Sequence, residues 1–244
     1  MPFTLEPIGY IETCFFEKFG IPRQPQLAPS ARGKLVLVPP FNDPDTVLGL
    51  EQCSHVWLEF IFHQNLSNGW KKKVRPPRLG GNLKQGVFAT RSSFRPNGLG
   101  LSVVTLDSIE YNQGELALWF SGVDLLSGTP IVDIKPYLPY VDCIPAATHS
   151  LAGVAPAALS VRAQPALVAL SQHYPQLLLK PLESLLTELL SQDPRPAYHS
   201  FNCERLYAMT LHYEQILLNV RWRYELDEDE QLMIVIVDIK KAEI

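Results

Sequence analysis

Apolar and polar residues alternate along much of the first 140 residues, with the period of two that is typical of β-strands. The expected strands are Lys34–Val38, His55–Phe62, Gly86–Thr90, Leu101–Ile109 and Glu115–Ser121. The segment Tyr111-Asn-Gln-Gly114 is a turn signal, so the last two strands are expected to form a hairpin. Many short strands at close spacing indicate a β-barrel or a sandwich, and the pattern alone does not choose between them.

A helical period replaces this pattern in the second part of the chain. Leu182, Leu185, Leu186, Leu189 and Leu190 recur at spacings of three and four, which places them on one face of a helix. A shorter helix is expected at Pro165–His173, and alternating strands at Tyr207–Leu211, Val220–Leu226 and Met233–Val237. An Ala-, Ser- and Pro-rich stretch at 146–166 suggests a connection. We therefore expect a mainly β domain at 1–145 and a small α+β domain at 146–244.

Composition places the chain among ordinary globular proteins, with 46% hydrophobic and 19% charged residues in a length of 244. Cys14, Cys53, Cys143 and Cys203 lie far apart without CxxC spacing, which argues against a disulfide framework and against a metal site made of cysteines. No signal peptide and no apolar run of about 20 residues is visible. We expect a cytoplasmic protein that is not inserted in a membrane.

Charge is distributed unevenly. Residues 60–106, called here the basic segment, contain no Asp or Glu. Its eight positive residues are Lys71, Lys72, Lys73, Arg75, Arg78, Lys84, Arg91 and Arg95. The whole chain has a formal charge of −4, so the remainder sums to −12, because −12 plus 8 is −4. A local positive field of this kind attracts phosphate groups. A merely solvated loop is the alternative interpretation.

Common nucleotide and metal motifs are absent. Gly98-Leu-Gly100 lacks the third glycine and the strand–turn–helix context of a Rossmann site, and the sequence has no Walker loop and no HExxH. His55 and His63 could share a strand face, but structural histidines are the simpler interpretation, so no metal is expected.

Two short segments carry candidate chemistry. Ser-Gly-Thr-Pro at 127–130 forms a tight turn, after which alternation places Asp133, Lys135 and Tyr137 on one face of an extended segment. These three side chains could handle a proton or anchor a substrate, or they could form a surface ion pair beside a stacked Tyr. Residues 193–198 either end a helix or present Arg195 and Tyr198 to a ligand.

Several segments together resemble the TsaA-like family, in particular its bacterial TrmO members. They are Phe19-Gly-Ile-Pro-Arg-Gln-Pro25, Ser54-His-Val-Trp57, Phe62-His-Gln64, Arg75-Pro-Pro-Arg-Leu-Gly-Gly-Asn82, Gly86-Val-Phe-Ala-Thr-Arg91, Ser93-Phe-Arg-Pro-Asn97, Asp133-Ile-Lys-Pro-Tyr137 and Asp193-Pro-Arg-Pro-Ala-Tyr198. They occur in the family's order and span most of the chain. One departure is Gly98, where the family pattern leads us to expect a second proline, and we expect this glycine to loosen its loop.

The resemblance implies a non-Rossmann β-barrel, a homodimer, and S-adenosylmethionine-dependent methylation of N6 of threonylcarbamoyladenosine next to the anticodon of tRNA. It also implies the cofactor-binding residues, which are Pro25, Gln26, Leu27, His63, Gln64, Arg91, Leu101, Leu126, Ser127, Gly128 and Thr129.

Within this interpretation, Asp133 is the first candidate for the base, with Lys135 and Tyr137 orienting the substrate or stabilising charge. The anticodon stem-loop is expected to contact Lys71, Lys72, Lys73, Arg75, Arg78, Arg95, Asn97, Arg195 and Tyr198, with Phe94 or Trp70 available for stacking. The alternatives are a non-catalytic module that senses S-adenosylmethionine or binds RNA, and a hydrolase using Asp133 and Lys135. The hydrolase lacks an accompanying nucleophile–base pair or metal set.

Overall fold

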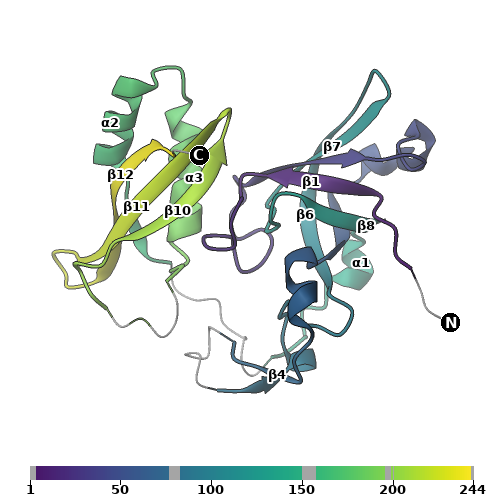
Figure 1. Ribbon diagram of the computed structural model, residues 1–244, viewed down its shortest axis with the longest axis horizontal. Helices are drawn as coiled ribbons and strands as arrows, with labels where there is room; N and C mark the ends of the chain where they lie inside the picture. Colours follow the sequence, from purple (N-terminus) through teal and green to yellow (C-terminus); the bar gives the residue numbers. More distant parts are fainter. Residues whose placement is uncertain (1–3, 77–82, 150–157, 196–198, 200, 243–244) are drawn as a thin grey trace.

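The computed structural model describes residues 4–76, 83–149, 158–195, 199 and 201–242. The first part of the chain forms a closed six-stranded antiparallel barrel in the order β1-β2-β7-β6-β3-β8, with β1 pairing to β8 to close it (Figure 1). Its strands are β1 (Gly9–Thr13), β2 (Arg32–Leu37), β3 (His55–Ile61), β6 (Leu99–Asn112), β7 (Glu115–Ser121) and β8 (Thr129–Pro136). The choice between barrel and sandwich is therefore settled in favour of the barrel.

The barrel interior is filled by the apolar members of the alternating pattern. Every strand contributes at least one residue that is 0% exposed, among them Ile11, Leu35, Leu58, Val104, Leu118 and Ile131. The period of two sends these side chains inward and their neighbours outward, as in small barrels whose core is made of side chains.

Shorter elements lie between and after the barrel strands. They are the 3-10 helices η1 (Pro44–Val47), η2 (Leu50–Gln52), η3 (His63–Asn68) and η5 (Val87–Ala89), the helix α1 (Pro139–Asp142), and the ribbon of β4 (Lys73–Val74) and β5 (Gln85–Gly86). The strand expected at 86–90 is wrong, because only Gly86 pairs and the next three residues form η5. The expected hairpin is confirmed, and its turn uses left-handed backbone at Gln113 and Gly114.

The second part of the chain is a four-stranded sheet covered by two helices (Figure 1). Its elements are β9 (Ser160–Arg162), α2 (Gln164–His173), α3 (Leu179–Leu190), β10 (Tyr207–Tyr213), β11 (Ile216–Leu226) and β12 (Leu232–Lys241). The sheet order is β10-β11-β12-β9, with only β9 parallel to its neighbour. The leucine face of α3 is buried, with Leu182, Leu186 and Leu190 each 0% exposed. The expected α+β unit is confirmed.

The loop that follows β1 packs against the C-terminal sheet. Phe15 forms an isolated antiparallel bridge with Leu211, and the ring of Phe19 stacks on Trp222 with centroids 5.8 Å apart. Phe15 and Trp222 are both buried. The barrel and the sheet therefore share an apolar contact formed by residues 15–19.

No helix among the described residues is long and apolar enough to cross a membrane.

Candidate active site

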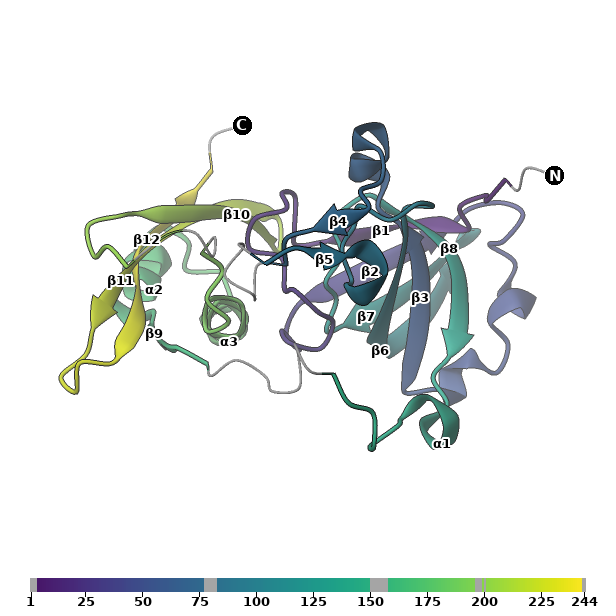
Figure 2. The ribbon, with the colours of Figure 1, turned by 90° about the horizontal axis from the view of Figure 1, so that it is seen from below.

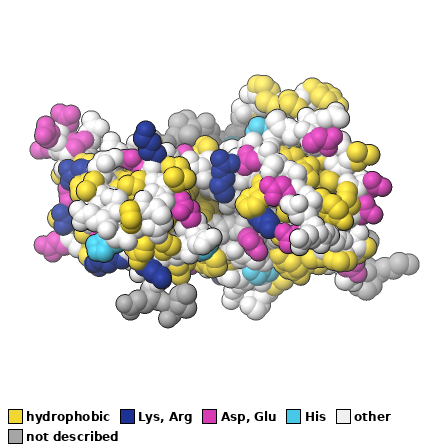
Figure 3. All heavy atoms as spheres, turned by 90° about the horizontal axis from the view of Figure 1, so that it is seen from above, with side chains coloured by type: hydrophobic (Ala, Val, Ile, Leu, Met, Phe, Trp, Pro, Cys, Tyr) yellow, Lys and Arg dark blue, Asp and Glu magenta, His cyan; other side chains and the backbone are white. Residues whose placement is uncertain are grey.

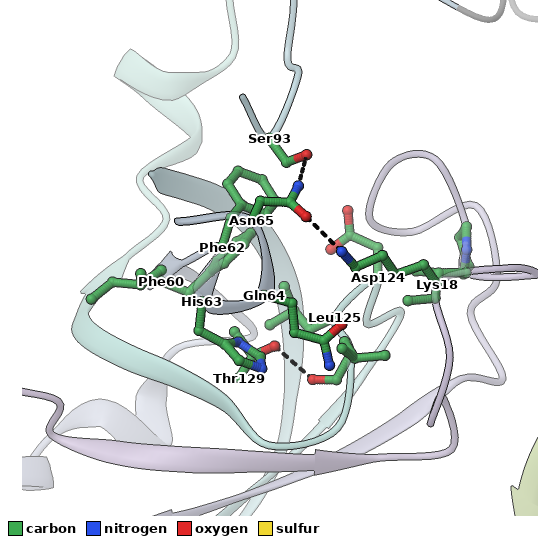
Figure 4. A pocket seen from close by; sticks show the side chains of 14 residues that line it. Lys18, Phe60, Phe62, His63, Gln64, Asn65, Ser93, Asp124, Leu125 and Thr129 are labelled. Carbon is green, nitrogen blue, oxygen red and sulfur yellow. Dashed lines mark hydrogen bonds between the residues drawn. The ribbon is translucent and has the colours of Figure 1, made fainter. Parts of the chain in front are cut away.

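A pocket of about 270 Å³ lies at the end of the barrel where β3 and β7 finish and β8 begins. His63 and Gln64 of η3 line it, together with Thr129 at the start of β8 (Figure 4). Leu126, from the turn before β8, lines it as well. Ser93 of the basic segment is also part of the wall. Two regions that sequence analysis singled out separately, the basic segment and the Ser-Gly-Thr-Pro turn, therefore meet at one pocket.

The turn before β8 is held rigidly by β1 and the residues after it. Ser127 donates its backbone N–H to the Phe15 carbonyl at 2.7 Å, and Gly128 donates to the Ile11 carbonyl at 2.8 Å. Gly128 has φ of +79°, a conformation that favours glycine. Ser127 and Gly128 do not line the pocket themselves, but these bonds fix the backbone between Leu126 and Thr129, which do.

Side-chain hydrogen bonds join η3 to two other segments of the chain. The Asn65 carbonyl oxygen accepts from Lys18 Nζ, and the Asn65 amide donates to Ser93 Oγ (Figure 4). The backbone N–H of Phe62 donates to the Gly98 carbonyl at 2.7 Å. These bonds fix three walls of the pocket relative to one another.

Gly98 corrects one expectation. It does not loosen its loop, because it is buried and bonded through its carbonyl to Phe62. Proline cannot adopt the φ of +61° found at Gly98, because its ring fixes φ at about −65°. A Cβ added at this position would lie 2.6 Å from Leu66 Cδ2. The loop therefore needs glycine where the family pattern led us to expect a second proline.

Asp124 is a pocket residue that sequence analysis did not select. It follows β7, lines the pocket, and accepts a 2.7 Å hydrogen bond from Ser102 Oγ of β6, whose side chain is buried. Burial raises the pKa of Asp124 to about 6, against the opposing effects of the Ser102 hydrogen bond and the Arg91 charge. The signal in the sequence was a lone acid at the head of the motif Asp124-Leu-Leu-Ser-Gly-Thr-Pro130, surrounded by apolar residues.

The remaining expected cofactor residues lie outside the pocket lining. Arg91 donates a hydrogen bond to Gln24 Oε1 and acts electrostatically on Asp124. Gln26 has φ of +64° and donates its backbone N–H to the Gly122 carbonyl at 2.9 Å. Five other expected members of this group also lie outside the lining, namely Pro25, Leu27, Leu101, Ser127 and Gly128. Leu27 and Leu101 are exposed.

Asp133, Lys135 and Tyr137 are all described, and none of them lines the pocket. Lys135 Nζ lies 2.7 Å from Glu59 Oε1 on β3 and also bonds the Asp133 carboxylate. The hydrogen bond with Asp133, followed by that with Glu59, raises the pKa of Lys135. The Tyr137 ring lies 5.8 Å from the Trp57 ring. Within the single chain this geometry matches the surface ion-pair interpretation, and the catalytic role stays a prediction.

The basic segment keeps its positive charge uncompensated. Within the described part of the chain, no Asp or Glu side chain forms an ion pair with any of its cations. Five of the residues expected to contact RNA are exposed, namely Lys71, Lys72, Lys73, Arg75 and Asn97. Figure 2 looks onto the β4–β5 ribbon that carries some of them, and Figure 3 shows the opposite face, where the barrel half carries many acidic side chains.

Other residues expected to contact RNA are occupied within the protein. Arg95 donates to the Thr90 carbonyl at 2.7 Å and so shapes its own loop. Arg195 pairs with Asp193 at 3.0 Å and lies over the Tyr224 ring at 4.8 Å, which agrees with the helix-stop interpretation. Arg78 and Tyr198 lie outside the described residues.

Among the residues that the structure describes, no group of three or more His, Cys, Asp or Glu side chains is placed to hold a metal ion.

An aromatic ring that could stack on a base lies near the cations of the basic segment, since Lys71 Nζ is 3.9 Å from the centre of the Phe94 ring.

Comparison with known proteins adds a family to this geometry. Residues 10–143 match the model of the tRNA-methyltransferase O N-terminal domain, and residues 156–242 match that of the TrmO C-terminal domain. The chain is 46% identical over 227 residues to a tRNA (adenine(37)-N6)-methyltransferase of Escherichia coli, covering 91% of this chain and 93% of that protein. It is 48% identical over 224 residues to a putative S-adenosylmethionine-dependent methyltransferase, RcsF, of Pseudomonas aeruginosa, with 92% and 94% covered. A crystal structure of TrmO from Pseudomonas aeruginosa aligns with a TM-score of 0.72 at 40% identity, over 98% of this chain and 100% of the other.

Proposed function

The chain belongs to the TrmO family, and from this we propose that it transfers a methyl group from S-adenosylmethionine to N6 of threonylcarbamoyladenosine beside the anticodon of tRNA. Relatives matched over nearly their full length are named tRNA (adenine(37)-N6)-methyltransferase and S-adenosylmethionine-dependent methyltransferase. The observation that carries the proposal is the pocket at the barrel end, where η3 and Ser93 of the uncompensated basic segment converge with the turn before β8.

The residues of the pocket suit this cofactor. Phe60, Phe62 and Leu125 form an apolar wall against which an adenine ring can pack. Arg91, close enough to influence Asp124, offers a guanidinium for the cofactor carboxylate. We propose that the implied set of eleven residues from Pro25 to Thr129 holds the cofactor, although only His63, Gln64, Leu126 and Thr129 line the pocket itself. The bound cofactor supplies an electrophilic methyl group on a sulfonium, so the reaction needs no metal.

The residues of the chain have two further tasks in this reaction. The acceptor nitrogen belongs to a urea-like group and is a poor nucleophile because its lone pair is delocalised. It must therefore be aligned with the methyl group, and its proton must be removed. The turn at Ser127 and Gly128 supports the alignment, since its backbone cannot shift without breaking hydrogen bonds to Ile11 of β1 and to Phe15.

The RNA contacts follow from charge and position. Ser93 of the basic segment lines the pocket, and the backbone N–H of the exposed Lys71 donates to the carbonyl of the adjacent Phe94 at 3.2 Å. Phosphates of the anticodon stem-loop bound by Lys71 and its neighbours would bring the next nucleotide to the site. We place Lys71, Lys72, Lys73, Arg75, Arg78 and Asn97 in this contact. Arg95, Arg195 and Tyr198 join it if binding releases the first two from their internal bonds.

We propose a substrate-anchoring role for Asp133, Lys135 and Tyr137 at the end of β8, where Lys135 bonds Asp133 and Glu59 and the Tyr137 ring lies beside Trp57. We further propose that residues 1–145 bind the cofactor and catalyse, that residues 146–244 position tRNA, and that the protein acts as a homodimer in the cytoplasm. The four free cysteines of the described structure support the proposed location, because a reducing compartment keeps thiols unpaired.

Two measurements test the function. Purified protein should transfer a labelled methyl group from S-adenosylmethionine to tRNA that carries threonylcarbamoyladenosine, and not to tRNA lacking it. Mass spectrometry of tRNA nucleosides should show the methylated nucleoside disappear from cells without the gene and return with the wild-type gene. Binding of cofactor and tRNA without transfer would instead support the non-catalytic module.

A further inference from the structure

Asp124 stands apart from the other acids of the barrel domain because it faces the pocket. The Ser102 hydroxyl occupies Oδ1 at 2.7 Å, and no Lys or Arg forms an ion pair with the carboxylate among the described residues. Asp133, by contrast, is bonded to Lys135 on the outer wall. A carboxylate that faces a pocket, with one oxygen oriented by a neighbouring hydroxyl and no Lys or Arg bonded to it among the described residues, has the arrangement of a general base.

We propose that Asp124 is the general base of the methyl transfer, oriented by Ser102. This inference rests on the proposed function. The N6 nitrogen forms a bond to the methyl carbon while the bond between that carbon and the sulfonium sulfur breaks, with its electron pair passing to sulfur. Asp124 Oδ2 takes the N6 proton, and after product release the protonated carboxyl loses this proton to water. Charge and atoms balance without a further reactant.

The surroundings of Asp124 determine its pH response. Burial holds its pKa above the usual range of a carboxyl, while Ser102 of β6 and the charge of Arg91 act in the opposite direction. Lys18 and His63 also line the pocket, from the loop after β1 and from η3. Asp124 must be ionised to accept a proton, so activity should fall as the pH drops through its pKa. Loss of the Ser102 hydrogen bond should raise that pKa and move the fall to higher pH.

The test uses the full chain, with Asp124→Asn, Ser102→Ala and Asp133→Asn compared to wild type. Asp107→Asn is the matched control, because Asp107 also accepts from a serine, Ser121 Oγ at 2.9 Å, but outside the pocket lining. Single-turnover methyl transfer to modified tRNA is measured from pH 5 to 9. Affinity for S-adenosylmethionine is measured by calorimetry. A carbon-13 NMR titration of labelled aspartates without ligand follows the Asp124 carboxyl directly.

The expected result is a loss of at least about 100-fold in single-turnover rate for Asp124→Asn, with affinity for the cofactor within about threefold of wild type. In Ser102→Ala both the acid limb of the rate and the NMR midpoint of Asp124 should move to higher pH. Asp107→Asn should keep the wild-type profile.

Three results would overturn the inference while leaving the proposed function intact. Asp124→Asn could lose cofactor affinity in step with rate, which would make Asp124 a cofactor anchor. It could retain its rate and acid limb, which would exclude it as the base. Asp133→Asn could be the one variant that loses the fall of the methyl-transfer rate at low pH, which would make Asp133 the general base. A wild-type protein that methylates no tRNA would instead refute the proposed function.

Discussion

Glu188 on α3 holds Ser30 of the barrel domain by two hydrogen bonds, from the Ser30 backbone N–H at 2.7 Å and from its Oγ at 2.8 Å. Both donors meet one partly buried carboxylate, so the two units are joined by a charged polar contact in addition to the apolar one at Phe15 and Phe19. Hydrogen bonds to an ionised group are stronger than neutral ones.

Glu188→Ala should therefore loosen the junction between the units. We expect a loss of about 1.5–3 kcal/mol in the free energy of unfolding, the usual range for a hydrogen bond to a charged group. Urea denaturation measures it. Glu183→Ala is the matched control on the same helix, because the Glu183 carboxylate accepts from Gln164 within the C-terminal unit and does not reach the barrel. Equal losses for both variants would contradict a special role of the junction.

Cys14 offers an independent probe of the same junction. Burial raises the pKa of the Cys14 thiol to about 12, so at pH 8 it holds little of the reactive thiolate. Iodoacetamide should modify the exposed Cys143 and Cys203 first, as read by peptide mass spectrometry, and Cys14 only in denaturant. The Cys14 carbonyl accepts from the His212 N–H at 2.9 Å, so Glu188→Ala should accelerate its labelling. Labelling of native Cys14 as fast as Cys143 would show that the thiol is accessible.

The basic segment should give tRNA binding a steep dependence on salt. Removing two cations with Lys71→Gln and Arg75→Gln should reduce the slope of log affinity against log salt by about 1.5, at roughly 0.7–0.9 per phosphate contact. The control is Arg32→Gln with Lys34→Gln, which also removes one Arg and one Lys. Arg32 already pairs with Asp107, and Lys34 with Glu115. Fluorescence anisotropy over a salt series measures both. A common slope for the two double variants would place the RNA elsewhere.

Gly98 should resist substitution because of its backbone conformation. Gly98→Ala forces a side chain into left-handed backbone, at a cost of about 1–2 kcal/mol, and brings the added Cβ to 2.6 Å from Leu66 Cδ2, so the Leu66 side chain must shift. Gly49→Ala is the control, since Gly49 has left-handed backbone at φ of +87° with no atom near the added Cβ. Urea denaturation gives the difference between them. Gly98→Pro should cost more than either substitution, and a Gly98→Pro variant as stable as wild type would disprove the conformational argument.

The architecture was largely readable from the sequence, and its failures have identifiable causes. The hairpin of β6 and β7 and the leucine face of α3 follow from strict periodicity and a clear turn. Strand β1 was missed because its five residues hold only one strongly apolar interior position, Ile11, and its strand geometry depends on pairing with β2 and β8. Residues 86–90 resemble a strand, but pairing ends at Gly86 and a 3-10 turn follows.

The site was less accessible than the fold. The resemblance pointed to His63, Gln64, Leu126 and Thr129, which do meet at one pocket, yet nothing in local sequence shows that Asp133 and Lys135 satisfy each other on the outer wall. Asp124 was missed because its burial depends on Ser102, 22 positions earlier in the chain, and on the loops that close the barrel end. Such long-range pairing leaves no periodic trace.

The loop that follows β1 serves both units at once. Lys18, Ile21 and Pro22 line the pocket, while Phe15 and Phe19, a few positions away, rest on the C-terminal sheet. A molecule bound in the pocket therefore stabilises a loop that contacts both units. With such a molecule bound, the two units should unfold together on heating. Replacing either unit by an unrelated domain would also change the pocket.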